Sequence, residues 1–226
     1  MSLEAREPFY FFTRHNLIYL TGRKARNLKE LVLGIKEASS ASIYYHTHHF
    51  LQEHEYLTPE PTNDFAYWIA SVHGDSVLGE QVASIDLREF FRLRDIRLKI
   101  IAVMDEFLQG NPGCDHDVPA GLEFHFMKAQ TFVSPTKHIA RNMLEFKECL
   151  QKVSVMSIYY HMFESRLRLQ RPYNDFSYWL LDSFGENSLA EKFQRIDPYT
   201  YTLDNLRQTL IGMLDKRINE ETHDKP

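Results

Sequence analysis

The sequence predicts a mainly α fold in which one helical unit of about a hundred residues occurs twice. Two short motifs each appear at two places in the chain, in the same order, and apolar residues recur between them at helical spacing. A segment rich in Gly and Pro separates the two occurrences. We therefore expect a tandem duplication of a roughly four-helix unit, with a short extended arm or strand at the start of each copy and a pseudo-two-fold axis between the copies.

The repeat rests on two motifs. Ser-Ile-Tyr-Tyr-His stands at residues 42–46 and again at 157–161. Asn-Asp-Phe-Ala-Tyr-Trp at residues 63–68 is matched by Asn-Asp-Phe-Ser-Tyr-Trp at 174–179, and these hexapeptides contain both tryptophans of the chain. The pentapeptides are 115 residues apart and the hexapeptides 111, which one loop of different length explains. The repeat predicts the following division of the chain: helical unit 1 at 1–109, a linker at 110–121, helical unit 2 at 122–218 and a disordered tail at 219–226.

Each copy is expected to open with an extended segment followed by a helix. Polarity alternates around Phe9 and Phe11 and again in residues 122–126, which is typical of a strand, and the two segments could pair into a small sheet. The residues that follow place apolar side chains on one helical face: Leu28, Leu31, Val32 and Ile35 in the first copy, and Met143, Phe146 and Leu150 in the second. The pentapeptide is expected to be helical as well.

The hexapeptide marks the start of the next helix. Asn63 and Asn174 are favourable N-cap residues, because an Asn side-chain oxygen accepts from a free N–H of the first helical turn. Asp64 and Asp175 then lie beside the positive end of the helix dipole. Gly74 can take the left-handed conformation that ends a helix. Two further helices complete each copy, and their apolar residues in the first copy are Leu78, Val82 and Ile85, then Ile96, Ile100, Met104 and Leu108.

Charge and apolar pattern argue against several classes of protein. A net charge of −5 and a pI near 6.1 provide no concentrated basic field for phosphates, so nucleic acid is not expected as a partner. No apolar run approaches the roughly 20 residues that cross a bilayer, and residues 1–8 lack the apolar stretch of a signal peptide. Cys114 and Cys149 do not make a disulfide framework. We therefore expect a cytoplasmic protein without a membrane partner.

Three motifs follow one another in the first copy: Ser-Ile-Tyr-Tyr-His-Thr-His at 42–48, Asn-Asp-Phe-Ala-Tyr-Trp at 63–68 and Leu-Gly-Glu at 78–80. In this combination the chain resembles a bacterial family of unknown function with duplicated Tyr-Tyr-His and Asn-Asp-Phe-x-x-Trp helical units. The resemblance covers most of the chain. It implies a prokaryotic cytoplasmic protein, and it implies no chemistry, since no activity is attached to the family.

Polar residues that occur in both copies are the candidates for a functional site. The candidates chosen from these shared residues are Arg26, Tyr45, His46 and Asp64 in the first copy and Arg141, Tyr160, His161 and Asp175 in the second. One interpretation is a buried network in which an Asp at a helix start orients the His. The other is a ligand pocket with aromatic walls, in which an Arg engages a phosphate or carboxylate. No nucleophile elbow, phosphate loop or dinucleotide motif is present, so catalytic residues stay unknown and enzyme activity stays undecided.

A cluster of histidines at positions 46–54 offers a metal site as an alternative. His46, His49 and Glu53 would share one face of a helix and could hold a divalent metal. The second copy keeps only the first of these three residues, so such a site would belong to the first copy alone.

The leading hypothesis is a non-catalytic module that binds a ligand or a protein, or that regulates one. It rests on the repeat, the aromatic content of 13% and the lack of any catalytic motif. No cofactor is predicted, the partner is a protein or a small molecule, and an oligomer is possible. The alternative is a metal-dependent enzyme or metal-binding protein that uses the histidines of the first copy.

Overall fold

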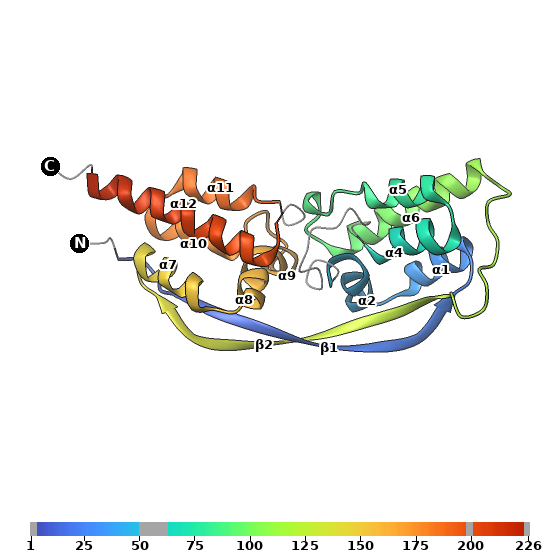
Figure 1. Cartoon of the computed structure of the whole chain (residues 1–226), viewed down its shortest axis with the longest axis horizontal. Helices are drawn as coiled ribbons and strands as arrows, with labels where there is room; N and C mark the ends of the chain where they lie inside the picture. Colours follow the sequence, from blue (N-terminus) through green and yellow to red (C-terminus); the bar gives the residue numbers. More distant parts are fainter. Residues whose placement is uncertain (1–3, 50–62, 198–200, 224–226) are drawn as a thin grey trace. The chain divides into compact units, whose positions relative to one another are not determined.

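The computed structural model describes residues 4–49, 63–197 and 201–223 of the chain. Its extended elements are two strands, β1 (Phe9–Ala25) and β2 (Phe124–Ala140), of 17 residues each. They pair with each other in a two-stranded antiparallel sheet, and their arrows run in opposite directions in Figure 1. Each strand opens with two buried Phe residues on either side of one exposed residue, which is the alternation of a half-buried strand.

Helices follow each strand in a similar order. After β1 come α1 (Leu28–Glu37), α2 (Ser40–Tyr44), the π-helix η1 (Tyr45–His49), α4 (Asp64–Trp68), the π-helix η2 (Ile69–His73), α5 (Ser76–Ala83), the 3₁₀-helix η3 (Leu87–Glu89) and α6 (Leu93–Gly110). After β2 come α7 (Met143–Lys152), α8 (Val155–Tyr159), the π-helix η4 (Tyr160–Glu164), α9 (Ser165–Leu169), α10 (Asp175–Phe184), α11 (Asn187–Gln194) and α12 (Leu203–His223). Among the described residues, no helix is long and apolar enough to cross a membrane.

The predicted helix ends of the hexapeptides are confirmed. The side chain of Asn63 accepts from the backbone N–H of Ala66, and that of Asn174 accepts from Ser177, so both asparagines cap their helices. Gly74 ends η2 with φ of 90°, a left-handed conformation that glycine takes without steric cost. The backbone around the second motif therefore follows from local side-chain chemistry.

The chain forms two compact units. We call them the α7–α12 unit, which consists of Met1–His15 and Thr131–Pro226, and the α1–α6 unit, which consists of Asn16–Gln130. Each strand therefore belongs to both units. The first residues of β1 lie with α7–α12, and the first residues of β2 lie with α1–α6.

These bounds differ from the predicted units at 1–109 and 122–218, because each set of helices takes in the strand segment that opens the other copy. The predicted linker packs on the α1–α6 unit, where an Asp115 carboxylate oxygen accepts from the Leu28 N–H at 2.8 Å. In addition, α12 extends to His223, so residues 219–223 of the predicted disordered tail are helical.

Aromatic rings from the strands fill the core of each unit. In the α7–α12 unit, the ring centroid of Phe9 lies 5.4 Å from Phe146, 5.3 Å from Phe176 and 5.6 Å from Trp179. Phe11, which is 1% exposed, belongs to the same cluster. Burial of such large side chains is the main driving force for docking the strand on the helices.

Phe124 and Phe126 of β2 make the corresponding contacts in the α1–α6 unit. The rings of Phe124 and Phe65 are stacked with centroids 5.2 Å apart. Gly34 of α1 lies directly against Phe126, since a Cβ at Gly34 would stand only 2.3 Å from the Phe126 Cζ atom. The residue at the matching place of α7 is Cys149, which is buried, so the two units fill the space beneath their strands differently.

The predicted fold class is wrong in its architecture. The sequence predicts short arms and a tandem pair of four-helix units in a mainly α fold, whereas the described residues are 59% helix and 17% strand and contain a two-stranded antiparallel sheet. The strands reach 17 residues because their backbones pair with each other. Most of their later side chains are exposed, so apolar alternation, the signal used for strands, ends long before the strands do.

Candidate functional site

The pentapeptide of the first copy holds a residue of β2. The Ser42 hydroxyl donates to the backbone carbonyl of Met127 at 2.6 Å, and the Met127 N–H donates to His46 Nε2 at 2.9 Å. Ser42 and His46 can reach the same strand residue because positions four apart lie on one face of a helix. We call this arrangement a strand clamp, since two side chains satisfy both backbone groups of one strand residue.

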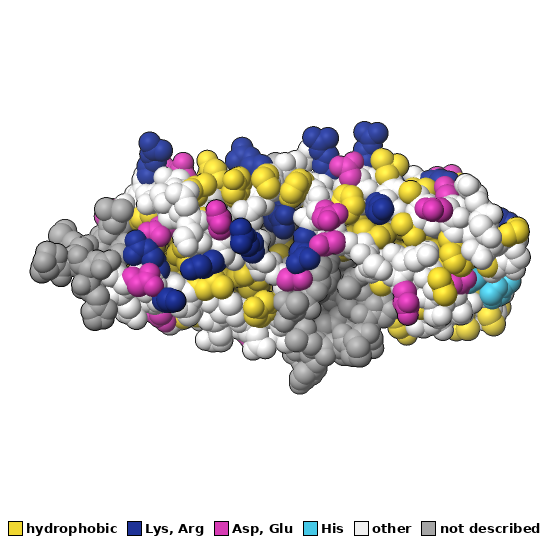
Figure 2. Space-filling model, turned by 90° about the horizontal axis from the view of Figure 1, so that it is seen from above, with side chains coloured by type: hydrophobic (Ala, Val, Ile, Leu, Met, Phe, Trp, Pro, Cys, Tyr) yellow, Lys and Arg dark blue, Asp and Glu magenta, His cyan; other side chains and the backbone are white. Residues whose placement is uncertain are grey.

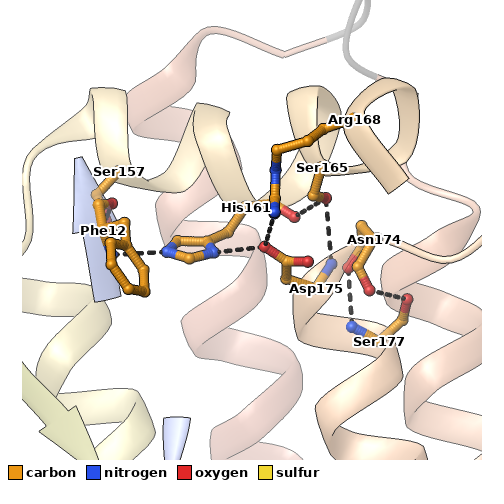
Figure 3. A network of polar contacts seen from close by, with 8 residues as sticks. All are labelled: Phe12, Ser157, His161, Ser165, Arg168, Asn174, Asp175 and Ser177. Carbon is orange, nitrogen blue, oxygen red and sulfur yellow. Dashed lines mark hydrogen bonds and ion pairs between the residues drawn. The ribbon is translucent and has the colours of Figure 1, made fainter. Parts of the chain in front are cut away.

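The second pentapeptide makes the same clamp on β1. The Ser157 hydroxyl donates to the carbonyl of Phe12 at 2.6 Å, and the Phe12 N–H donates to His161 Nε2 at 2.8 Å (Figure 3). Both histidines lie in π-helical turns, η1 and η4, a feature that is frequent at functional sites. The clamps occupy backbone groups that an edge strand would otherwise leave unpaired.

Hydrogen bonding fixes the state of both imidazoles. His46 Nδ1 lies 2.7 Å from Asp64 Oδ2, and His161 Nδ1 lies 2.8 Å from Asp175 Oδ2. Because Nε2 accepts from a backbone N–H, Nδ1 must carry the proton of a neutral ring and donate it to the carboxylate. Burial lowers the pKa of His161, an effect that the hydrogen bond and charge of Asp175 oppose.

The tryptophans of the hexapeptides hold the chain just before each strand. The Trp179 indole N–H donates to the carbonyl of Glu7 at 2.7 Å, and that of Trp68 donates to Leu122 at 2.9 Å. Both motifs that identify the repeat therefore bind the strand segment of the other half of the sequence.

An open surface pocket of about 400 Å³, which we call the cavity, lies against the clamp of the α7–α12 unit. It is lined by Pro8, Phe9, Tyr10, Phe12, Val133, Tyr160, His161, Arg168 and Asp175. The Arg168 guanidinium lies over the Tyr160 ring, 5.1 Å from its centroid, and its Nη2 is 3.3 Å from Asp175 Oδ2. Burial raises the pKa of Tyr160, so its hydroxyl stays protonated at neutral pH.

A buried ion pair lies on the same π-helix as His161. Arg14 of β1 is 1% exposed, and its Nη1 donates to Glu164 Oε2 at 2.7 Å. The Arg14 guanidinium also lies 4.6 Å from the centroid of the Tyr159 ring. Burial raises the pKa of Glu164, and the charge of Arg14 opposes this effect. This pair further anchors β1 to the helix that carries the clamp.

The structure brings together only part of the predicted site. His46 joins Asp64 and His161 joins Asp175, with Tyr45 and Tyr160 edge-on to the imidazoles at 5.0 and 4.9 Å between ring centroids.

Arg26 and Arg141 lie elsewhere. They are exposed residues at the starts of α1 and α7, where the backbone N–H of each donates to the Glu four residues later, Glu30 and Glu145. Neither arginine contacts the His–Asp pairs, because each serves a helix start with its own local carboxylate partner.

The metal hypothesis finds no support among the described residues. The side chain of His49 and all of Glu53 lie outside them, and within residues 4–49, 63–197 and 201–223 no group of three or more His, Cys, Asp or Glu residues could hold a metal ion. Both ring nitrogens of His46 are already hydrogen-bonded, so metal binding there would have to break the clamp or the bond to Asp64.

Three residues of the site were missed in the sequence. Ser42 and Ser157 open the identical pentapeptides, so their identity in both copies was the available signal. Arg168 stands where the first copy has Glu53. Because the candidate residues were chosen among those shared by both copies, a position that differs between the copies was not selected.

One face of the protein carries both signs of charge. Figure 2 shows Lys and Arg side chains interspersed with Asp and Glu across the visible face, together with apolar side chains. Proteins that bind nucleic acid mainly through phosphates instead concentrate basic residues on one face.

Comparison with known proteins adds a family and a solved relative. A family model described as "Family of unknown function (DUF5752)" matches residues 6–215. The solved structure of OrfY from Thermoproteus tenax is similar to this chain, with 31% identity, a TM-score of 0.80 and coverage of 94% of this chain and 96% of that chain. No curated protein matches significantly.

Proposed function

Since the chain belongs to the DUF5752 family, whose function is unknown, we propose from its geometry that it is a non-catalytic binding module. Its ligand occupies the cavity between β1, Tyr160 and Arg168 in the α7–α12 unit. The observation that carries this proposal is the cavity itself, which lies beside a His–Asp pair whose hydrogen bonds are already used to hold the strand.

A catalytic role is disfavoured by the state of the site's acid–base groups. General base catalysis needs a nitrogen or oxygen that can take a proton from a substrate. His161 Nε2 accepts from Phe12 and Nδ1 faces Asp175, so neither nitrogen is open to the cavity. Among the described residues that line the cavity there is no Ser, Cys or Lys that could serve as a nucleophile.

A binding role is favoured by size and lining. Ligand sites commonly have volumes of roughly 300–1,000 Å³, with apolar walls and a few polar groups that fix orientation. The cavity combines apolar walls from Tyr10, Phe12 and Val133 with one guanidinium and one carboxylate, those of Arg168 and Asp175. Rigid anchoring of β1 by the clamp holds these walls in place.

Three probes that share a phenyl ring test whether the cavity binds ligands: phenylacetate, benzyl alcohol and benzylamine. We expect at least one to shift the backbone amide NMR signals of Tyr10 and Val133 saturably. Val133→Trp should abolish the shift of the Tyr10 amide by filling the cavity, whereas Val77→Trp, at a residue 58% exposed in the other unit, should preserve the shifts of both amides. Absence of saturable shifts for all three probes, or unchanged binding in Val133→Trp, would refute the proposal.

A further inference from the structure

We infer that the ligand of this cavity is a small organic monocarboxylate with an apolar body, whose carboxylate is held by Arg168. The inference rests on the proposed binding function and names the class of ligand for the same site. Three features carry it: the unused donors of the guanidinium, the neighbouring carboxylate of Asp175 and the apolar walls supplied by β1 and β2.

Arg168 is placed to receive an anion. Its side chain is 44% exposed, and among the described residues its guanidinium donates one hydrogen bond, to Asp175 Oδ2 at 3.3 Å. A charge-assisted bond of this kind is usually about 2.7–2.9 Å long, so this contact is a weak one. A guanidinium carries about five N–H donors in a planar fork. Contact with the face of the Tyr160 ring restrains the guanidinium while leaving donors for a ligand.

The neighbouring Asp175 favours a carboxylate over a phosphate. Asp175 is 17% exposed and donates nothing when ionised, so it repels a second anion at short range. That repulsion is larger for a phosphate monoester, which carries about 1.5 to 2 negative charges at neutral pH, than for a singly charged carboxylate. A planar carboxylate also matches the guanidinium fork through two parallel hydrogen bonds.

The remaining walls select the body of the ligand. Pro8, Tyr10, Phe12 and Val133 present mostly apolar surface to the cavity, and Tyr10 and Val133 are 54% and 44% exposed without ligand. Covering such surface is favourable by about 25 cal/mol per Å². An aromatic or branched aliphatic group therefore complements the walls when the carboxylate reaches Arg168.

Ligand binding at Arg168 affects the hydrogen bond that holds β1, because Arg168 and His161 share the Asp175 carboxylate. Asp175 Oδ2 is the partner of both Arg168 Nη2 and His161 Nδ1, and His161 Nε2 holds the Phe12 N–H (Figure 3). A ligand carboxylate that draws Arg168 away leaves Asp175 to His161 alone. The hydrogen bond from Nδ1 then strengthens, Nε2 becomes a better acceptor, and the Phe12 amide exchanges more slowly with solvent.

Matched probes and variants test the inference by calorimetry and NMR. Phenylacetate should bind about tenfold or more tightly than benzyl alcohol, as one charge-assisted bidentate contact allows. It should also bind more tightly than phenyl phosphate and benzylamine. Arg168→Gln should remove the preference for phenylacetate, and Arg168→Lys should keep only part of it. Arg195→Gln, at an arginine 81% exposed and paired with Glu191, should keep it fully. Phenylacetate should slow hydrogen exchange of the Phe12 amide and leave the Met127 amide unchanged.

The outcomes separate this inference from the proposed function. Equal binding of benzyl alcohol and phenylacetate, with no effect of Arg168→Gln, would overturn the carboxylate assignment while leaving a binding cavity. Tighter binding of phenyl phosphate or benzylamine would overturn it as well. Failure of all four probes to bind would overturn both, and unchanged exchange of Phe12 with bound phenylacetate would overturn the link to the strand.

Discussion

The two strand clamps hold their strands with nearly the same geometry but have different surroundings. In both, a Ser hydroxyl donates to a strand carbonyl at 2.6 Å, and the His–Asp contact measures 2.7 Å in one unit and 2.8 Å in the other. Asp64 is 34% exposed, whereas Asp175 is 17% exposed and has Arg168 beside it. Shared residues thus build the fold, and the proposed ligand site depends on a residue that the first copy lacks.

The largest expected effect comes from removing a strand side chain from the core of the opposite half of the sequence. Phe11→Ala should destabilise the α7–α12 unit by about 3–5 kcal/mol, as expected for a fully buried Phe. Hydrogen exchange measured by mass spectrometry should show loss of protection in α7, α10 and α12, with much smaller changes in α1 and α6. Phe126→Ala should give the reverse pattern. Loss of protection confined to the helices nearest in sequence to each Phe would contradict the assignment of the strands to the two units.

The local parts of this comparison could be predicted from the sequence. Asn caps, the glycine that ends η2 and the apolar faces of the helices depend on residues within one or two turns, so their chemistry is readable in the chain. The His–Asp pairing was also one of the two interpretations of the shared residues. It was accessible because the pentapeptide and hexapeptide are identical or nearly so in both copies.

The partners of the clamps could not be predicted. Phe12 and Met127 are bound through their backbone groups, which every residue has, and lie 149 and 81 residues from their histidines. No side-chain pattern marks such contacts. The strands extend through exposed residues for the same reason: backbone pairing stabilises them, and backbone pairing leaves no trace in apolar periodicity.

The next largest effect is expected on removal of either clamp histidine, which tests whether the two clamps stabilise the protein equally. His161→Ala leaves the Phe12 N–H without its acceptor and should cost about 1–3 kcal/mol for the unsatisfied amide, and His46→Ala should cost a similar amount at Met127. Urea unfolding measures each cost. Because the clamps share no partner, the double variant should lose the sum within about 0.5 kcal/mol. An unchanged free energy of unfolding in either single variant would show that its clamp does not stabilise the protein.

Lowering the pH should destabilise each unit through a different buried histidine, His161 in the α7–α12 unit and His73 in the α1–α6 unit. Burial lowers the pKa of His161 and of His73, and in His73 the charge of His116 acts in the same direction, opposed by Asp115 and Asp75. Burial therefore favours the neutral form of both rings in the folded protein. A folded-state pKa below the ordinary value of 6.5 means that this stability is present above about pH 6.5 and is lost as the pH falls.

Comparison of the two copies suggests a variant that removes the contribution of His73 to acid destabilisation. Phe184 stands in α10 where the first copy has His73, so His73→Phe should reduce the acid loss in the α1–α6 unit. Hydrogen exchange between about pH 7.5 and about pH 5 would measure it in each unit. Stability that stays constant or rises on acidification of the wild-type protein would contradict this prediction.

The smallest expected effect on stability is that of Arg168→Gln. The pair with Asp175 is partly exposed and long at 3.3 Å, so its loss should change the free energy of unfolding by less than about 1 kcal/mol. A small stability change combined with loss of phenylacetate binding would distinguish a ligand residue from the structural clamp beside it. A loss as large as that of His161→Ala would instead assign Arg168 to the structural network.

The tautomers of His46 and His161 test most directly whether the shared histidines hold the strands. Long-range proton–nitrogen NMR at neutral pH reports which ring nitrogen carries the proton. Both rings should be neutral, with a protonated Nδ1 bonded to Asp and an unprotonated Nε2 accepting from Met127 or Phe12. A proton on Nε2 in either ring, or rapid exchange between the two tautomers, would contradict the clamp and make that imidazole available as a base.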